Sequence, residues 1–421
     1  MNIKTILKSS VAATALFAVA VPMSTTANAA DDTLSSGQKT KLKVSGYVSR
    51  AIWHADDGTS DKTFFTGGAG TQTRVRWIAS GTLNENVTAG ATIEIELPKP
   101  NNEAASVLQS GARPGNASTD SADKTNWDIR HEYVWVNHKK FGKVSLGQTD
   151  HGFGGSYGQT FSGTGSIDSD SGVSFGNGLT FVNTSAAAKA VSTNTTGAVF
   201  SGRRNNSDRG DLIRYDTPKF MGFDAKTSLH DNGTADVSVG YGGKFGSFAV
   251  KSRAGYVNKD GDVSHNFTAA GSIAVQHDSG LNASFGAYKV NFAGPRSKSA
   301  LSATINSAML SGPQDGNNLG GRDDAYSYNF RLGYNAAKLV GVGPTSFGLQ
   351  YVTSQNEKEN DGDAESWSIG VVQKFSALGM DVGLVYSNYA YSAESETTVG
   401  TKTAETYDDI DVIALQTVFN F

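Results

Sequence analysis

The sequence predicts an all-β protein: a transmembrane up-and-down antiparallel β-barrel of about 16 strands. Three observations predict this fold. Glycine accounts for 49 of 421 residues, apolar residues recur with the period of two that strands have, and short connections alternate with long ones. Only 38% of the residues are hydrophobic, so we do not expect a large helical core. Strands of membrane barrels are segments of about ten residues with alternating hydrophobicity, separated by turns.

The composition excludes several classes of function. The chain has no cysteine, which removes disulfide frameworks, zinc ribbons, iron–sulfur clusters and thiol nucleophiles. Its 36 basic and 40 acidic residues alternate along the chain without basic blocks, so nucleic acid is not an expected partner. The seven histidines are scattered and show no zinc-binding spacing. We therefore expect no catalytic residue, no metal and no cofactor.

The first 29 residues have the pattern of a secretory signal peptide. Lys4 and Lys8 precede the apolar run 11–21, and Ala27 and Ala29 supply the small residues of a cleavage site. A transmembrane anchor is the alternative, but it needs about 18 apolar residues. We expect residues 1–29 to be removed and residues 30–421 to form one barrel domain.

The strand period is clearest in three segments. In 88–97, alanine, isoleucine and leucine share one face, while Glu94 and Glu96 share the other. In 326–334, tyrosine, phenylalanine and leucine oppose polar residues, and in 127–135 the apolar face includes Tyr133 and Trp135 while Arg130 lies on the ionic face. The predicted strands are 41–51, 73–80, 88–97, 127–138, 143–149, 209–217, 223–230, 235–241, 247–257, 264–277, 281–292, 325–336, 345–355, 365–375, 381–391 and 407–421.

The connections alternate in length. Short ones are predicted at 81–87, 139–142, 218–222, 242–246, 278–280, 337–344 and 376–380, and long hydrophilic ones at 99–126, 150–208, 293–324 and 392–406. The brief connections 231–234 and 258–263 are exceptions. Short turns at one end and long loops at the other are typical of outer-membrane barrels. A soluble β-sandwich is the alternative, but aromatic residues near the strand ends and the terminal phenylalanine favour the barrel.

Three local sequences carry a family resemblance. Phe419 and Phe421 end the last strand, and the segments 141–147 and 214–223 read FGKVSLG and RYDTPKFMGF. With these motifs the chain resembles the general diffusion porins of Gram-negative bacteria along essentially its whole mature length. The resemblance implies a 16-stranded barrel in the outer-membrane lipid, usually a homotrimer, whose C-terminal strand is read by the barrel assembly machinery. It also implies that the third external loop, here 150–208, folds inward and narrows the pore.

The charged residues define a candidate constriction. Arg74 and Arg76 share the lumen face of one strand, and a hairpin turn at 84–86 places Arg76 opposite Glu94 and Arg74 opposite Glu96. In the family a basic cluster on this wall faces acidic groups of the inward loop, and Arg74 matches one of its positions. Two departures from the family are Gln148, where many members have arginine, and a loop without a proline-centred acidic tip. The predicted pore-lining set is Arg74, Arg76, Glu94, Glu96, Arg130, Asp168, Asp170, Arg203, Arg204, Arg209 and Arg214.

The predicted function is a water-filled channel for passive diffusion of ions and small hydrophilic solutes. For each charge a solvated position on a loop or rim is the alternative. A substrate-selective channel would need an aromatic track or a dense lumen charge of one sign, whereas these charges are mixed. A barrel enzyme or adhesin would need a Ser-His constellation or folded loops, which the glycine- and serine-rich loops do not clearly offer.

Overall fold

The computed structural model describes residues 40–68, 71–96, 128–185, 190–201, 209–258, 265–292, 324–356, 362–398 and 401–421. The predicted signal peptide, the connection 99–126, and 293–324 except Asp324 lie outside these residues. In the part that is described, no helix has the length and hydrophobicity needed to cross a membrane.

The described chain forms one large antiparallel sheet that closes on itself. Its strands are β1 (Thr40–Asp56), β2 (Asp61–Gly67), β3 (Arg74–Asn84), β4 (Val87–Glu96), β5 (Asp128–His138), β6 (Gly142–Thr149), β9 (Gly210–Asp216), β10 (Phe223–His230), β11 (Ala235–Phe245), β12 (Phe248–Asn258), β13 (His265–His277), β14 (Leu281–Phe292), β15 (Ala325–Val340), β16 (Gly343–Gln355), β17 (Asp363–Phe375), β18 (Met380–Thr398), β19 (Thr401–Thr406) and β20 (Ile410–Asn420). Pairing of β20 with β1, from Tyr47 with Asn420 to Asp56 with Asp411, closes the barrel.

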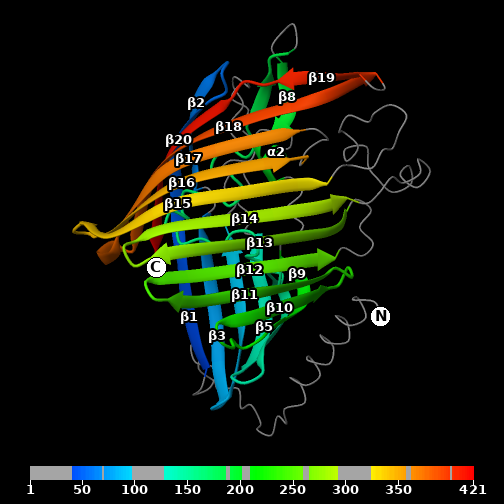
Figure 1. The fold of residues 1–421 in the computed structure, drawn as a ribbon. Coiled ribbons are helices and arrows are strands. Elements are labelled where there is room, and N and C mark those ends of the chain that lie inside the picture. The colour runs from blue at the N-terminus through cyan, green and yellow to red at the C-terminus, as the bar shows by residue number, and fades with distance from the viewer. Residues whose placement is uncertain are drawn as a thin grey trace.

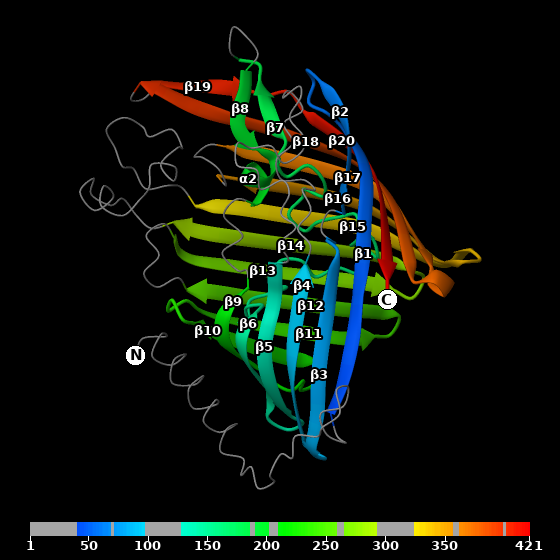
Figure 2. The ribbon, with the colours of Figure 1, turned by 180° about the vertical axis from the view of Figure 1, so that it is seen from behind.

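These segments make 16 barrel strands because two strands are interrupted. β2 pairs with the upper part of β1 and β3 with its lower part, so β2 and β3 are successive pieces of one strand. In the same way, β18 pairs with β19 over its C-terminal part and with β20 over its N-terminal part, so β19 and β20 are pieces of one strand. The predicted fold and strand number are therefore confirmed. Figure 1 shows β10 to β17 across the near wall, and Figure 2 shows β1, β3, β4 and β5 on the opposite wall.

One connection expected to be a long loop is largely strand. The segment 392–406 belongs to a hairpin in which β18 runs on to Thr398 and pairs with β19. Similarly, β1 continues beyond the predicted residue 51 to Asp56 and turns directly into β2. Both hairpins are rich in threonine, whose branched side chain suits a strand even where the segment is hydrophilic. Hydrophilicity alone therefore did not separate loops from extended strands.

The apolar face of the barrel points outward. On β15, Phe330 and Leu332 are 48% and 58% exposed, whereas Asn329 and Arg331 are 4% and 5% exposed. The same alternation places Ile93 outside, at 47% exposed, and Glu94 inside, at 0%. An apolar exterior around a polar interior is the pattern of a barrel in lipid.

A β-bulge changes the predicted faces of β5. Glu94 pairs with His131 but Ile95 pairs with Ile129, which leaves Arg130 as an extra residue. Beyond the bulge the alternation is inverted, so Tyr133 and Trp135 lie inside, where Lys143 Nζ is 5.3 Å from the centre of each ring. The prediction that these two aromatic residues lie on the outer face is wrong. Alternation predicts which face of the sheet a side chain lies on only up to the next bulge in the strand.

Residues 150–185 and 190–201, here called the inward loop, run along the inner wall of the barrel, and residues 183–185 lie beside Thr406 and Tyr407 at its end. They include β7 (Thr180–Asn183), β8 (Ala190–Thr195) and the short helix α2 (Thr196–Ser201). Polar side chains of the wall donate to carbonyls of the loop backbone: Ser238 Oγ to Gly152 O (2.6 Å), Ser272 Oγ to Ser156 O (2.8 Å), Asn329 Nδ2 to Asp170 O (2.8 Å), Gln350 Nε2 to Ser169 O (2.6 Å) and Ser366 Oγ to Gly172 O (2.8 Å). Side chains of β11 to β17 thus supply hydrogen-bond donors for these carbonyls of the loop.

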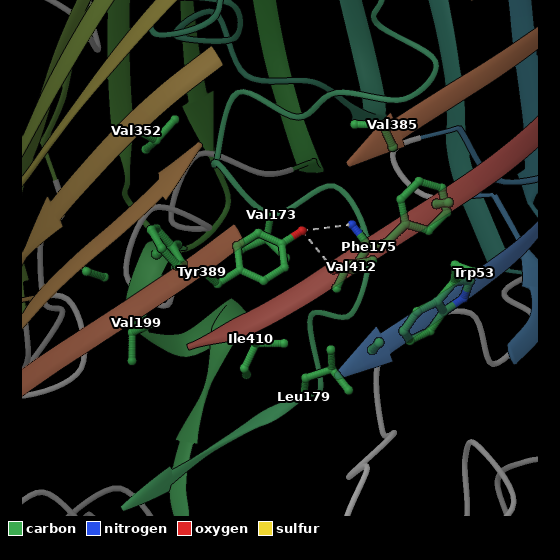
Figure 3. Close-up of a cluster of buried hydrophobic side chains, with 14 of the residues drawn as sticks. Trp53, Val173, Phe175, Leu179, Val199, Val352, Val385, Tyr389, Ile410 and Val412 are labelled. Atoms are coloured by element: carbon green, nitrogen blue, oxygen red, sulfur yellow. Dashed lines mark hydrogen bonds between the residues drawn. The ribbon is translucent and has the colours of Figure 1, made fainter. Parts of the chain in front are cut away.

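The far end of the inward loop is anchored by an apolar cluster. Tyr389 on β18 donates its hydroxyl to Phe175 O over 3.0 Å, and Trp53 on β1 stacks on Phe64 with 4.0 Å between ring centres. Leu179 and Phe175 are fully buried beside these rings. Figure 3 shows the loop residues meeting side chains from β1, β18 and β20 in this cluster. The hydrogen bonds and packing of the described loop residues thus run from β10 round to β1, on the side of the barrel away from β3 to β5.

Candidate functional site

The wall of β3 to β5 carries the predicted ladder of ion pairs. Arg74 is in register with Glu96 and Arg76 with Glu94, as the hairpin parity predicts. Arg74 Nη2 lies 3.2 Å from Glu96 Oε2, and Arg76 is bonded to Glu94 by two guanidinium nitrogens. The turn that sets this register is held by Asn84 Oδ1, which accepts from the amide of Val87 over 3.0 Å. This turn therefore fixes which residues of β3 and β4 lie opposite each other, and with them the pairing of the four charged side chains.

Arg130 completes the group because of the β5 bulge. Its Nε lies 2.8 Å from Glu94 Oε1, and its Nη1 lies 2.8 Å from Glu96 Oε2. We call Arg74, Arg76, Arg130, Glu94 and Glu96 the charge cluster. Glu94 has no solvent exposure, whereas the side chain of Arg76 is 42% exposed. A fully buried carboxylate needs such compensation, and three arginines against two glutamates leave the cluster with a net charge of +1.

Arg74 also contacts the aromatic ring of Tyr47 on β1. The Arg74 guanidinium lies 5.1 Å from the centre of the Tyr47 ring, a cation–π contact of the kind worth about 0.5–1 kcal/mol or more. Its Nη1 reaches Glu94 Oε1 at 3.3 Å. Arg74 is therefore positioned as part of the wall, and Arg76 is the cluster member that projects furthest toward solvent.

A recess of about 280 Å³ opens beside the cluster on the inner face of β3 to β9. Its wall includes Arg76 together with Lys143, Arg214, Asp150 and Asp216. Charges of both signs, from the wall and from the first residue of the inward loop, thus line this recess. This arrangement can polarise and orient water and dissolved ions across the space between wall and loop.

The predicted acidic counterparts lie elsewhere. Asp168 lies against β15: its Oδ2 accepts from Thr164 Oγ1 over 2.5 Å, and its Oδ1 lies 3.9 Å from Arg331 Nη2. The backbone carbonyl of Asp170 is bonded to Asn329 on the same wall. The structure therefore brings Asp168 together with Arg331 and not with the charge cluster, because the loop runs along the wall of β15.

The arginines after the loop were predicted to join the cluster. Arg214 instead forms an ion pair with Asp216 at 2.7 Å and donates from Nη1 to the carbonyl of Asp150 over 3.0 Å. Arg209 Nη1 lies 3.9 Å from Asp150 Oδ1. Both arginines therefore hold the start of the inward loop. Arg203 and Arg204 lie outside the described residues.

The last residue is built into the closing seam of the barrel. The amide of Phe421 donates to Gly46 O over 3.0 Å, and the amide of Gly46 donates to Phe421 O over 2.9 Å. A Cβ added at Gly46 would meet the carbonyl oxygen of Arg74 on β3 and would also lie 2.8 Å from Cζ of the Phe421 ring, so glycine is required between β3 and the last residue. Phe419 pairs with Val48 and is 47% exposed on the outer face. The predicted assembly signal thus coincides with the seam.

Sequence reasoning missed several inward-facing residues. Arg331 and Arg253 are buried on the inner face, where Arg253 is bonded to Asp224 and Ser238. Their position on the polar face of an alternating strand could have shown that they face inward, but no local signal identifies the partners. His151 and His230 come together at the start of the inward loop, with ring centres 3.8 Å apart. Their linear spacing has no recognisable pattern.

An apolar-outside barrel with a charged interior and an inward loop defines the class of outer-membrane channels. The chain belongs to the Gram-negative porins, whose family model matches residues 12–401. It is accordingly a porin channel of the outer membrane. No protein matches in a search of the curated proteins.

Solved structures share the fold. An anion-selective porin from Comamonas acidovorans has a TM-score of 0.53 at 14% identity and covers 91% of this chain and 100% of its own. OmpT of Vibrio cholerae, in a trimer form, has a TM-score of 0.52 at 14% identity, with 91% and 100% covered. The outer membrane channel DcaP of Acinetobacter baumannii scores 0.51 at 13% identity, with 92% and 99% covered. At these identities the likeness concerns the fold alone.

Proposed function

We propose that this porin is a general diffusion pore for ions and small hydrophilic solutes, narrowed between the charge cluster and the inward loop. The observation that supports the proposal is that the described loop residues are bonded to the wall from β10 round to β1, while the charge cluster stands on β3 to β5. The cluster and recess carry charges of both signs, which favours weak selectivity over recognition of one substrate. Passage then needs no catalysis, cofactor or energy source.

Conductance in planar bilayers tests this proposal. The purified protein should give open steps whose conductance rises in proportion to salt concentration, because a wide aqueous pore does not saturate with its ions. A substrate-selective channel would instead be blocked by micromolar to millimolar amounts of one solute. Saturating ion conductance together with such block would replace the general pore with the selective one.

The proposed assembly is a homotrimer, and charged residues on the outer face support a subunit contact. Arg50 is exposed on β1 between the outward-facing Val48 and Ile52, and Glu132 is exposed on β5 beside the outward-facing Val134. A charge on the lipid face of a barrel costs about 2–4 kcal/mol for arginine near the bilayer centre. Contact with another subunit would remove that cost.

Mass measurement in mild detergent tests the trimer. We expect three protomers for the native protein and a smaller trimer fraction for Arg50→Glu. Lys244→Glu, on an exposed residue at the short-turn end of β11, is the control and should leave the trimer intact. A native protein that is a clean monomer would contradict the proposal.

We also propose that the barrel assembly machinery recognises the C-terminal strand, and that the barrel carries no enzymatic activity. The first rests on the placement of Phe421 in the closing seam. The second rests on membership of the porin family. Hydrolysis of generic ester and peptide substrates by the purified protein, lost on mutation of a residue inside the barrel, would contradict the second.

A further inference from the structure

Three metal-ligating side chains meet at the start of the inward loop. His151 follows β6 by two residues, His230 is the last residue of β10, and Asp236 is the second residue of β11. They are 6%, 7% and 1% exposed. One ligand atom from each lies within 4.8 Å of the other two. The triad therefore joins the loop to two strands that it must cross on entering the barrel.

The separations match atoms bound to a common ion. His151 Nδ1 lies 3.5 Å and His230 Nε2 lies 3.7 Å from Asp236 Oδ2. Good N–H···O hydrogen bonds are shorter, at 2.7–3.2 Å. Two ligands of a tetrahedral zinc ion with bonds of about 2.0–2.1 Å are about 3.3–3.4 Å apart. Small side-chain rotations would therefore bring all three atoms to bonding distance.

The triad also holds unsatisfied polar atoms. Among the residues that the structure describes, His230 Nε2 and Asp236 Oδ1 are buried and have no hydrogen-bond partner. An unsatisfied buried group costs about 1–3 kcal/mol, and more when charged. A bound cation would satisfy both groups at once. A cation bound where the three ligand atoms converge would contact both of these atoms' side chains.

Neighbouring groups hold the Asp236 carboxylate in place. Ser228 on β10 donates its hydroxyl to Asp236 Oδ2 and accepts the amide of Gly152 over 3.1 Å. A Cβ added at Gly152 would lie 2.6 Å from Asp236 Oδ1, so glycine allows the loop to approach this closely. Such outer partners orient ligands and raise affinity in metal sites.

We propose that His151, His230 and Asp236 bind one divalent transition-metal ion of the zinc type. Two imidazoles and one carboxylate suit zinc, whereas calcium and magnesium prefer all-oxygen sites. Thr149 and Asp150, just before the triad, line the recess, so an ion can enter from the interior and keep water as a fourth ligand. The ion ties the start of the inward loop to β10 and β11. This inference rests on the fold and not on the conductance of the pore.

Metal titration of the full mature protein in detergent tests the site. After removal of metal with a chelator, Zn²⁺ is titrated calorimetrically, and Co²⁺ is titrated by visible absorption. We expect one ion per protomer and the intense absorption bands of tetrahedral cobalt. His230→Gln and the isosteric Asp236→Asn should each weaken binding by more than about tenfold. His277→Gln, at a half-buried histidine bonded to Ser279 at the end of β13, is the matched control and should bind as the native protein does.

Hydrogen exchange gives a second readout, independent of conductance. Zn²⁺ should slow exchange of the amides of 151–156 in the native protein and in His277→Gln, but not in Asp236→Asn. Gel mobility before and after heating shows whether each variant is folded. Native protein that binds no Zn²⁺, or binds Co²⁺ with only the weak spectrum of the hydrated ion, overturns the proposal even if every variant misfolds. Equal binding by native protein and folded Asp236→Asn overturns it as well.

Discussion

Arg130 Nε lies 2.8 Å from Glu94 Oε1 because a single extra residue in β5 turns the arginine inward beside its neighbour His131. Without the bulge, one side chain of this pair of residues would face the outside. The bulge therefore gives Glu94 a third arginine in addition to Arg74 and Arg76. Bulges near functional sites commonly redirect a side chain in this way.

Neutralising Glu94 should destabilise the barrel and shift its selectivity. In Glu94→Gln the three arginines lose their buried counter-charge, and the cluster changes from a net charge of +1 to +2. We expect a loss of up to about 3 kcal/mol in the free energy of unfolding, measured by urea titration in detergent, and a reversal potential displaced toward anions. Asp278→Asn, at an exposed turn residue, is the control. Unchanged stability and selectivity would contradict the expectation that the Glu94 carboxylate compensates the three arginines.

Removing two arginines should have the opposite effect on selectivity. The double variant Arg74→Gln, Arg76→Gln leaves Glu94 and Glu96 with Arg130 as their only cluster partner, so the reversal potential in a salt gradient should move toward cation preference. The shift should shrink as salt rises, because the Debye length falls from about 10 Å at 0.1 M to about 3 Å at 1 M. A reversal potential equal to that of the native protein at low salt would place both residues outside the constriction.

The Tyr389 hydroxyl should stabilise the anchored end of the inward loop. Tyr389→Phe leaves Phe175 O without the 3.0 Å bond, at a cost of about 1–3 kcal/mol. We expect a noisier open channel and a lower melting temperature. Tyr386→Phe on the same strand removes a hydrogen bond to Asp411 on β20 and serves as the matched control, since it leaves the loop contact intact. Equal noise in the two variants would contradict the expectation that the hydrogen bond of Tyr389 steadies the open channel.

Deleting Phe421 should impair insertion into the outer membrane while secretion to the periplasm continues. The deletion removes both backbone bonds to Gly46, at the seam between β20 and β1. Gly46→Val should reproduce part of the defect, because a side chain there collides with the Arg74 carbonyl on β3 and with the Phe421 ring. Gly341→Val, at a turn glycine where an added Cβ meets no atom, is the control. Normal amounts of heat-modifiable barrel in the outer membrane after the deletion would contradict this expectation.

The pairing of β3 with β4 in the charge cluster could be predicted from the sequence. The full set of residues that form the cluster could be predicted only in part. Arg74, Arg76, Glu94 and Glu96 follow from alternation on two strands joined by a short turn, and the structure pairs them as expected. Tyr133 was assigned to the wrong face because the bulge at Arg130 inverts the alternation. Alternation is a local property, and one inserted residue is enough to reverse it.

The charges of the inward loop were harder to predict. Asp168 was expected to face the arginines of β3 but lies near Arg331 on β15. The metal triad was missed because His151 and His230 have no recognisable spacing along the chain. Both outcomes depend on the path of the loop across the wall, which is set by single hydrogen bonds from serine, asparagine and glutamine side chains.

The sequence by itself determined the barrel, the strand order and, up to the bulge in β5, the outward face of the strands. These follow from interactions between near neighbours in the chain: alternation places apolar side chains toward lipid, and short turns join adjacent antiparallel strands. The closing strand was predicted from its place at the end of the chain and its terminal phenylalanine. Only the tertiary structure decided where the inward loop runs, which acids meet which arginines, and that His151, His230 and Asp236 converge. Those contacts join residues far apart in sequence through short polar side chains that occur throughout the chain, so no local pattern distinguishes the ones that meet.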